Sequence, residues 1–173
     1  MRELWWVPGS IIEPLPADDR ITRTEQGLQV VFPEDYKEFL KAYSGGDPNY
    51  ATFLAAGHEW CIDCFLCLLP KGVENPSFCY DIDVVWGQID DRLGEDPGGT
   101  GAEMVPIAVL FAGDMVCLDY REDPRNPKVV VWLHEESEFL KPSTRFVANT
   151  FTEFLDLVQP NPELGPKYPG GFN

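Results

Sequence analysis

The spacing of apolar residues predicts a helix over residues 33–43. Four large side chains recur every three or four positions and therefore share one helical face: Tyr36, Phe39, Leu40 and Tyr43. Pro33 suits the first turn, where its missing N–H would have no partner. Gly45 and Gly46 follow the last apolar residue and can end the helix in a left-handed conformation. The sequence therefore marks both the start and the end of this helix.

Three other segments also show helical spacing. Asp18 or Asp19 can cap a helix that runs to about Gln26, with Gly27 near its end. Residues 81–93 place apolar side chains at helical intervals and predict a helix that lies over a sheet. A last helix carries a stripe made of Phe151, Phe154, Leu155 and Val158.

Five segments rich in aromatic and β-branched residues predict strands, at residues 52–56, 59–69, 105–111, 115–120 and 128–134. Ala112-Gly113-Asp114 predicts a tight hairpin between the third and fourth. Residues 129–133 are apolar on both faces, which suits a central strand covered on both sides. These elements predict an α+β fold with a single domain: a mainly antiparallel sheet of about five or six strands, with helices packed on it and at both ends.

Both ends of the chain are rich in proline and glycine. Residues 1–17 predict an extended N-terminal arm packed on the domain, and residues 160–173 predict an extended C-terminal tail. Between them, residues 18–159 form one domain that is long enough to bury a sizeable core. Trp5 and Trp6 are adjacent and point in different directions, so one of them is expected to be exposed and able to anchor an interface.

The composition indicates a folded protein without a membrane span. Of the 173 residues, 44% are apolar, which argues against disorder despite the high charge. No run of about 18 apolar residues exists, and the N-terminus lacks the basic and apolar regions of a signal peptide. We therefore expect a cytoplasmic protein. The five cysteines are an odd number, which fits reduced thiols better than a complete set of disulfides.

The formal net charge of −16 argues against two kinds of partner. Nucleic acid and anionic lipid both attract basic surfaces, so neither is expected to bind. Two explanations of the charge remain: solubility alone, or an acidic face that meets a basic protein. Residues 81–96 carry six acids and one base, Arg92, a local charge of −5. The six acids are the candidate partner-binding residues: Asp81, Asp83, Asp90, Asp91, Glu95 and Asp96.

Cys61-x-x-Cys64-x-x-Cys67, with His58 nearby, is the strongest candidate for a metal site. Zinc takes thiolate and imidazole ligands that converge in a tetrahedron, usually from two Cys-x-x-Cys pairs, and here there is one cluster. The neighbours of the three cysteines are those of a buried strand, where cysteine packs as a small apolar residue. Because strand positions three apart face opposite sides, the three sulfurs are not expected to converge. Core packing is preferred to zinc, and no cofactor is expected.

Candidate catalytic residues are few. Nucleophilic catalysis by cysteine requires a histidine within reach, and His134 ends a strand, where a structural role is preferred. Asp114 is expected to hold the hairpin, and Asp119 to cap a neighbouring backbone group. Residues 98–101 are glycine-rich but lack the lysine and the preceding strand of a phosphate-binding loop. No enzymatic activity is expected.

A resemblance to a known family covers roughly residues 18–159. The chain resembles the SUKH superfamily, the Smi–Knr group, which includes fungal cell-wall synthesis regulators and bacterial toxin-immunity proteins. The first half carries the resemblance in Glu25-x-x-Leu28-x-x-x-Phe32-Pro33-x-Asp35-Tyr36-x-x-Phe39-Leu40 and Gly45-Gly46. The second half carries it in Val105-Pro106-Ile107-Ala108, Gly113-Asp114, Cys117-Leu118-Asp119, Val130-Val131-Trp132, His134-Glu135 and Ala148 to Leu155. Three residues depart from the family pattern: Gln29 replaces a usual glycine, Phe32 a usual leucine and Ser44 a frequent asparagine.

The resemblance implies a binding protein. The expectation is a non-enzymatic immunity protein that neutralises a cognate intracellular toxin by direct contact. Its acidic side chains would pair with a basic toxin domain, typically a nuclease. A regulatory scaffold related to the cell-wall synthesis regulators is the first alternative. A small zinc-binding protein or a metal-assisted hydrolase is the second.

Overall fold

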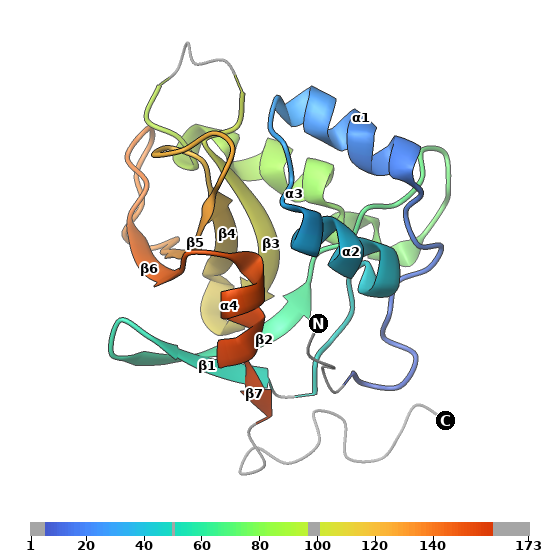
Figure 1. Cartoon of the computed structure of the whole chain (residues 1–173), viewed down its shortest axis with the longest axis horizontal. Coiled ribbons are helices and arrows are strands. Elements are labelled where there is room, and N and C mark those ends of the chain that lie inside the picture. The colour runs from blue at the N-terminus through green and yellow to red at the C-terminus, as the bar shows by residue number, and fades with distance from the viewer. Residues whose placement is uncertain (1–5, 50, 97–100, 161–173) are drawn as a thin grey trace.

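The α+β prediction is confirmed by the structure, a computed structural model that describes residues 6–49, 51–96 and 101–160. Within these residues, four α-helices surround one antiparallel sheet of seven strands in the order β6-β5-β4-β3-β2-β1-β7 (Figure 1). The helices are α1 (Asp18–Leu28), α2 (Glu34–Tyr43), α3 (Ile82–Ile89) and α4 (Phe151–Leu157). The strands are β1 (Ala51–Ala55), β2 (His58–Phe65), β3 (Met104–Leu110), β4 (Met115–Asp119), β5 (Lys128–Trp132), β6 (Thr144–Ala148) and β7 (Gln159–Pro160).

The predicted count of five or six strands was too low, because β6 and β7 lack a clear strand pattern. β6 mixes polar residues with the exposed Phe146, and β7 is two residues long. Both strands lie at the edges of the sheet, where only one side needs to pair. Local sequence patterns detect such short edge strands poorly.

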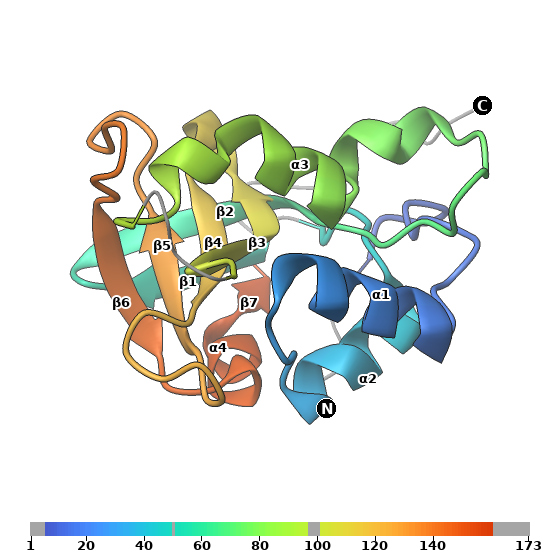
Figure 2. The same cartoon turned by 90° about the horizontal axis from the view of Figure 1, so that it is seen from above.

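The helices cover the two faces of the sheet unequally. α3 lies over one face, and α1, α2 and α4 lie over the other (Figure 2). On the α2 side the core is aromatic: the ring of Phe39 lies 4.9 Å from that of Phe65 and 5.1 Å from that of Phe151. A smaller apolar cluster lies beneath α3 and consists of Leu93, Met104, Cys117, Val130 and Trp132. α3 also contributes Ile82 and Val85 to the larger core, so it contacts both clusters.

Strand β5 confirms the prediction of a central strand covered on both sides. Val129 and Val131 belong to the larger core, whereas Val130 and Trp132 belong to the cluster beneath α3. All four residues are buried. The run of apolar residues at 129–133 therefore reflects two packed faces.

Helix α1 is longer than predicted. It continues through Gly27 to Leu28, and the left-handed residue that ends it is Gln29, with φ of 55° and ψ of 41°. The N–H of Gln29 donates to the carbonyl of Glu25, as in an αL cap. The left-handed conformation of residue 29 explains why the family pattern usually has glycine at this position. Ala17 is the N-cap, so the two aspartates predicted as caps lie in the first turn instead.

Helix α2 matches the prediction closely. It begins at Glu34, with Pro33 as the N-cap, and its apolar face is buried. Gly45 and Gly46 follow with φ of 77° and 111°. Trp6 is half-buried and stacks on Tyr43 with ring centroids 5.2 Å apart, so the start of the described chain packs on the domain. Trp5 lies outside the described residues.

Strand β2 and the β3–β4 connection differ from the prediction. β2 ends at Phe65, because the N–H of Cys67 donates instead to the carbonyl of Tyr80 (2.9 Å) and the chain there pairs with the segment before α3. The predicted hairpin contains a 3₁₀ turn, η3 (Phe111–Gly113), in which Ala112 and Gly113 have positive φ.

Two of the predicted segments lie largely beyond the described residues. Pro160, the first residue of the predicted tail, belongs to β7, and residues 161–173 lie outside the described chain. The glycine-rich segment at 98–101 is described only at Gly101. Among the helices of the described residues, none combines the length and the apolar character needed to cross a membrane.

Candidate functional site

The six predicted partner-binding acids lie in two separate groups at opposite ends of α3. Asp81 and Asp83 lie at its N-terminus, as the N-cap and a first-turn residue. The other four follow its C-terminus and are exposed: Asp90, Asp91, Glu95 and Asp96. The sequence predicted one acidic patch. In the fold, the two groups of acids are separated by the length of α3.

Asp81 is buried, at 3% exposure, which corrects its prediction as a surface residue. Both of its carboxylate oxygens face the guanidinium of Arg20, at 3.1 and 3.2 Å. They also accept hydrogen bonds from the N–H groups of Leu69 (2.7 Å) and Asp83 (3.0 Å). A carboxylate with this many internal partners is structural and is not available to another protein.

Asp83 belongs to the same cluster. Its carboxylate lies 3.0 Å from the guanidinium of Arg20 and is partly exposed. Arg20 thus ties α1 to the start of α3. We call Arg20, Asp81 and Asp83 the buried arginine cluster.

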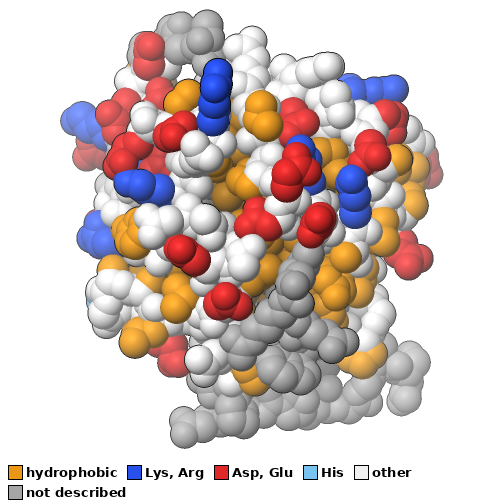
Figure 3. Space-filling model, in the orientation of Figure 1, with side chains coloured by type: hydrophobic (Ala, Val, Ile, Leu, Met, Phe, Trp, Pro, Cys, Tyr) orange, Lys and Arg blue, Asp and Glu red, His pale blue; other side chains and the backbone are white. Residues whose placement is uncertain are grey.

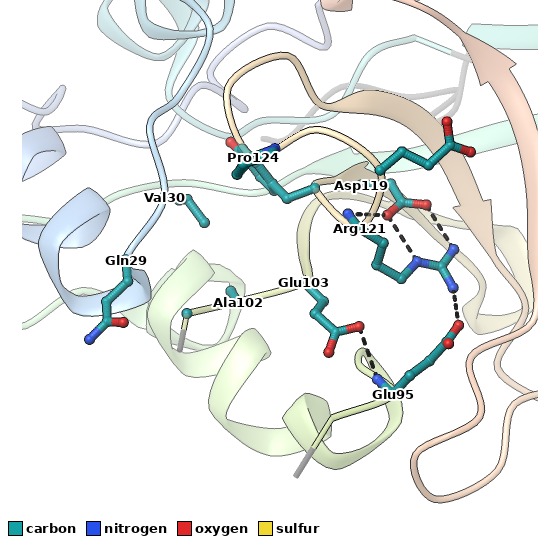
Figure 4. Close-up of a pocket in the computed structure, with 11 residues that line it drawn as sticks. Gln29, Val30, Glu95, Ala102, Glu103, Asp119, Arg121 and Pro124 are labelled. Carbon is teal, nitrogen blue, oxygen red and sulfur yellow. Dashed lines mark hydrogen bonds and ion pairs between the residues drawn. The ribbon is translucent and has the colours of Figure 1, made fainter. Parts of the chain in front are cut away.

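A cleft of about 650 Å³ opens between the end of α1, the segment that precedes β3 and the loop that follows β4 (Figure 4). We call it the acidic cleft. Four carboxylates and one arginine line it, together with Gln29, Val30, Tyr120 and Pro124. The charged residues are Glu95, Glu103, Asp119, Glu122 and Arg121.

Arg121 is held by two of these carboxylates. Its guanidinium lies 2.7 Å from Asp119 and 2.8 Å from Glu95 (Figure 4). Hydrogen bonding to Asp119, followed by that to Glu95, raises the pKa of Arg121 above its ordinary value. The ion pairs with Asp119 and Glu95 balance the positive charge of Arg121, so the cleft retains an excess of negative charge. Together these three residues form the cleft arginine cluster.

Glu103 lines the acidic cleft and holds the backbone beside it. Its two carboxylate oxygens accept hydrogen bonds from the N–H groups of Glu95 and Asp96, each at 3.0 Å. This clamp fixes the backbone that carries two of the predicted acids. Gly101 lies beside it and approaches the end of α1 so closely that a Cβ there would be 3.0 Å from the carbonyl oxygen of Gln29.

A second hollow, of about 310 Å³, adjoins the cleft and shares Gly101, Ala102 and Glu103 with it. We call it the acidic groove. Its apolar residues are Trp86, Leu93, Phe139 and Leu140, and it adds Asp90, Asp91 and Asp96 to the carboxylates. Four of the six predicted acids are thus brought together around two joined hollows.

Acidic residues are also present elsewhere on the surface. On the face shown in Figure 3, acidic side chains are scattered among fewer basic ones and gather at the upper left. The acidic cleft and the acidic groove differ from this general background because their carboxylates line concave surfaces, in which an inserted group is surrounded by them.

The three cysteines that were weighed as zinc ligands, with core packing preferred, differ in burial. Cys64 and Cys67 are buried, and Cys61 is half-buried at a different level of β2. A β-bulge between Ile62 and Cys64 interrupts the simple alternation assumed from the sequence. Burial, and then the nearby Asp81, raises the pKa of the Cys67 thiol to about 12, which keeps it protonated. Among the described residues, no three His, Cys, Asp or Glu side chains come together as a metal site.

His134 and the two aspartates named from the sequence have structural contacts. Asp114 accepts from the N–H of His134 (3.0 Å) and lies 2.9 Å from its Nδ1, which joins the β3–β4 turn to the end of β5. Asp119 accepts from the N–H of Arg121 (3.1 Å), in agreement with the predicted backbone cap.

Tyr120, which also lines the acidic cleft, has a structural contact as well. It donates its hydroxyl to the carbonyl of Val31 (3.1 Å), and burial raises the pKa of this hydroxyl.

Sequence analysis missed Glu103, Arg121, Glu122 and Phe139 as site residues. The spacing Asp119-x-Arg121 directly after a strand was the only local signal, since it allows the arginine to fold back on the carboxylate. The other contacts span more of the chain: Glu103 accepts from N–H groups seven and eight positions earlier, and Arg121 contacts Glu95, 26 positions earlier. Local periodicity does not report such contacts.

A family model matches most of the chain. A SUKH model described as SMI1-KNR4 cell-wall matches residues 18–155, from the start of α1 into α4. The match includes both acidic hollows and excludes Trp6 and β7. No curated protein and no solved structure matches the chain.

Proposed function

Because the chain belongs to the SMI1-KNR4 family of the SUKH superfamily, we propose that it is an immunity protein that neutralises a cognate toxin by direct, non-covalent contact. The partner is a basic protein, and a nuclease domain is the best candidate. Neutralisation takes place in the cytoplasm, where such a toxin would act. The protein carries out no reaction of its own.

One observation carries this proposal: among the described residues, seven carboxylates line two joined hollows with a single arginine, and that arginine is already paired with two of them. Such a surface attracts positive charge from a distance. Complementary charge raises the rate of association and disfavours acidic competitors. The net charge of −16 strengthens the same field.

The mechanism follows from the chemistry of nucleases. An enzyme that cleaves nucleic acid holds phosphate groups with lysine and arginine side chains. Carboxylates of the acidic cleft and the acidic groove can pair with the same cations and occupy the place of the substrate. Binding alone is then sufficient for protection, and no side chain of the hollows needs a catalytic role.

The test begins with the identity of the partner. The full-length chain is used to capture interacting proteins from the native cell, and each captured protein is purified and bound back to the chain. The expected partner is basic, is toxic when expressed alone and is harmless when co-expressed with this protein. A captured toxin that remains lethal during co-expression, despite tight binding, contradicts the proposal.

Charge reversal then tests whether the acidic hollows are the contact surface. Asp90→Lys with Asp91→Lys is expected to slow association with the toxin by about tenfold at low salt, because the attractive field is weakened. Glu38→Lys with Glu74→Lys is the matched control: both residues are exposed, line neither hollow and change the net charge equally. An equal slowing by both double variants would assign the effect to net charge alone.

A further inference from the structure

A tight turn at residues 138–141 presents an aromatic side chain beside the acidic groove. The N–H groups of Glu138 and Lys141 each donate to the other residue's carbonyl, both at 3.1 Å, which leaves Phe139 and Leu140 at the tip. We call this segment the Phe139 turn. Phe139 is 66% exposed although it lines a hollow that contains Trp86 and Leu93. A large apolar side chain in this position is a candidate interface anchor.

The backbone of the turn holds a conformation that leucine seldom adopts. Leu140 has φ of 53°, in the left-handed region, where non-glycine residues are disfavoured. Its N–H donates to the carbonyl of Asp91 (2.8 Å), which fastens the turn to the end of α3. Strained backbone of this kind persists only where surrounding contacts impose it, and it is concentrated at functional sites.

The base of the turn is also held firmly. Arg92 donates to the carbonyls of His134 and Ser137, the latter at 2.6 Å, and its guanidinium lies 5.2 Å from the ring centroid of Trp132. Ser137 donates to the carbonyl of Leu133 at 2.7 Å. Because the turn is already ordered, a partner that binds it loses little affinity to the ordering of loops.

The charges around the Phe139 turn define the partner. Asp90, Asp91, Asp96 and Glu103 line the same groove. Two bases that hold or belong to the turn have partners of their own: Arg92 donates to backbone carbonyls, and Lys141 lies 3.4 Å from Glu138. A second copy of this acidic chain would be repelled, whereas a basic surface would be attracted.

We infer that the Phe139 turn is the anchor of the partner interface: Phe139 enters an apolar socket on a basic protein, and lysine or arginine side chains around that socket pair with the acids of the groove. This inference rests on the proposed function, because it assigns the partner of the same surface. The inference adds an apolar contact to the electrostatic attraction that the acidic residues supply. Steering by charge sets the rate of encounter, and burial of Phe139 sets the lifetime of the complex.

The experiment uses a phage library of disulfide-closed peptides, selected on the immobilised full-length chain at low salt. Enriched peptides are expected to combine an apolar residue with flanking lysine or arginine, and to lose at least about thirtyfold in affinity on Phe139→Ala, the loss typical of a hot spot. Phe111→Ala is the matched control, because Phe111 is 78% exposed and does not line the groove. Thermal melting of both variants checks that the fold is intact.

Three outcomes overturn the inference: no peptide is enriched, the enriched peptides bind Phe139→Ala as tightly as the unaltered chain, or they contain no excess of basic residues. Sedimentation that reveals a dimer lost on Phe139→Ala also overturns it, by assigning the surface to a second copy. None of these readouts involves toxicity. If the peptide experiment fails, the proposal that the protein neutralises a toxin is therefore not affected. If co-expression fails to protect cells from the toxin, the peptide result still identifies the Phe139 turn as a docking surface.

Discussion

Two arginine–carboxylate clusters at opposite ends of α3 contain similar residues in different surroundings. In the buried arginine cluster, the side chains of Arg20 and Asp81 are 7% and 4% exposed. In the cleft arginine cluster, those of Arg121 and Glu95 are 21% and 61% exposed. Both arginines contact two carboxylates, at distances between 2.7 and 3.1 Å. The other carboxylates do not follow this contrast, because Asp83 is 40% exposed and Asp119 is 12% exposed. The difference in solvent exposure therefore lies between the Arg20–Asp81 pair and the Arg121–Glu95 pair.

This difference in exposure changes how much each pair contributes to stability. A charge that is buried and loses its partner remains desolvated, so removal of one member of a buried pair is costly. A pair that faces water is screened, and its net contribution to folding is small. We therefore assign the Arg20–Asp81 pair to the stability of the α1–α3 contact. The Arg121–Glu95 pair faces water on the surface that we propose as the contact of a partner.

The largest effect is expected for Asp81→Asn. The substitution keeps the size of the side chain but leaves Arg20 with a buried charge that only Asp83 balances. The free energy of unfolding should fall by about 3–5 kcal/mol, measured by urea denaturation. Asp83→Asn serves as the control, because its side chain is 40% exposed, and it should cost about 1 kcal/mol or less. Equal losses for the two variants would show that burial does not distinguish them.

An intermediate effect is expected for Gly101→Ala in the acidic cleft. Gly101 has φ of 96°, and its new Cβ would lie 3.0 Å from the carbonyl oxygen of Gln29. Strain and crowding together should reduce the free energy of unfolding by about 1–3 kcal/mol. Gly72→Ala measures the backbone strain alone, since Gly72 also has positive φ, 81°, but nothing within 4 Å of its Cβ position. The difference between the two losses is then the cost of crowding at Gly101. If both variants lose the same amount, the close approach to α1 does not matter.

The smallest effect is expected for Glu95→Gln. This change removes one of the two carboxylates that hold Arg121, and Asp119 remains in contact at 2.7 Å. The free energy of unfolding should fall by less than about 1 kcal/mol, and the difference should vanish in about 1 M salt, where exposed pairs are screened. The loss caused by Asp81→Asn should persist in the same salt. A salt-resistant loss for Glu95→Gln would place the cleft arginine cluster in a drier environment than its exposure indicates.

The sequence predicted best the elements whose pattern is local. The face of α2 and the two-sided burial of β5 were both predicted, because repeated apolar spacing reports which sides of an element are covered. Even the departure at Gln29 is informative, since a position where glycine is usual adopts the left-handed conformation that glycine favours. The class of fold followed from such patterns. Strand count did not, because edge strands pair on one side only.

The candidate site required the tertiary structure. Asp81 and Asp91 belong to one acidic run, yet one is buried against Arg20 and the other is exposed beside Phe139. What separates them is contact with residues many positions away along the chain: α1 reaches the N-terminus of α3, and the β5–β6 connection reaches its C-terminus. The sequence by itself determined the helices, the central strands and the sign of the charge, through local periodicity and composition. Only the folded chain decided which carboxylates lose their water and which remain exposed to solvent, because desolvation depends on neighbours that chain order does not specify.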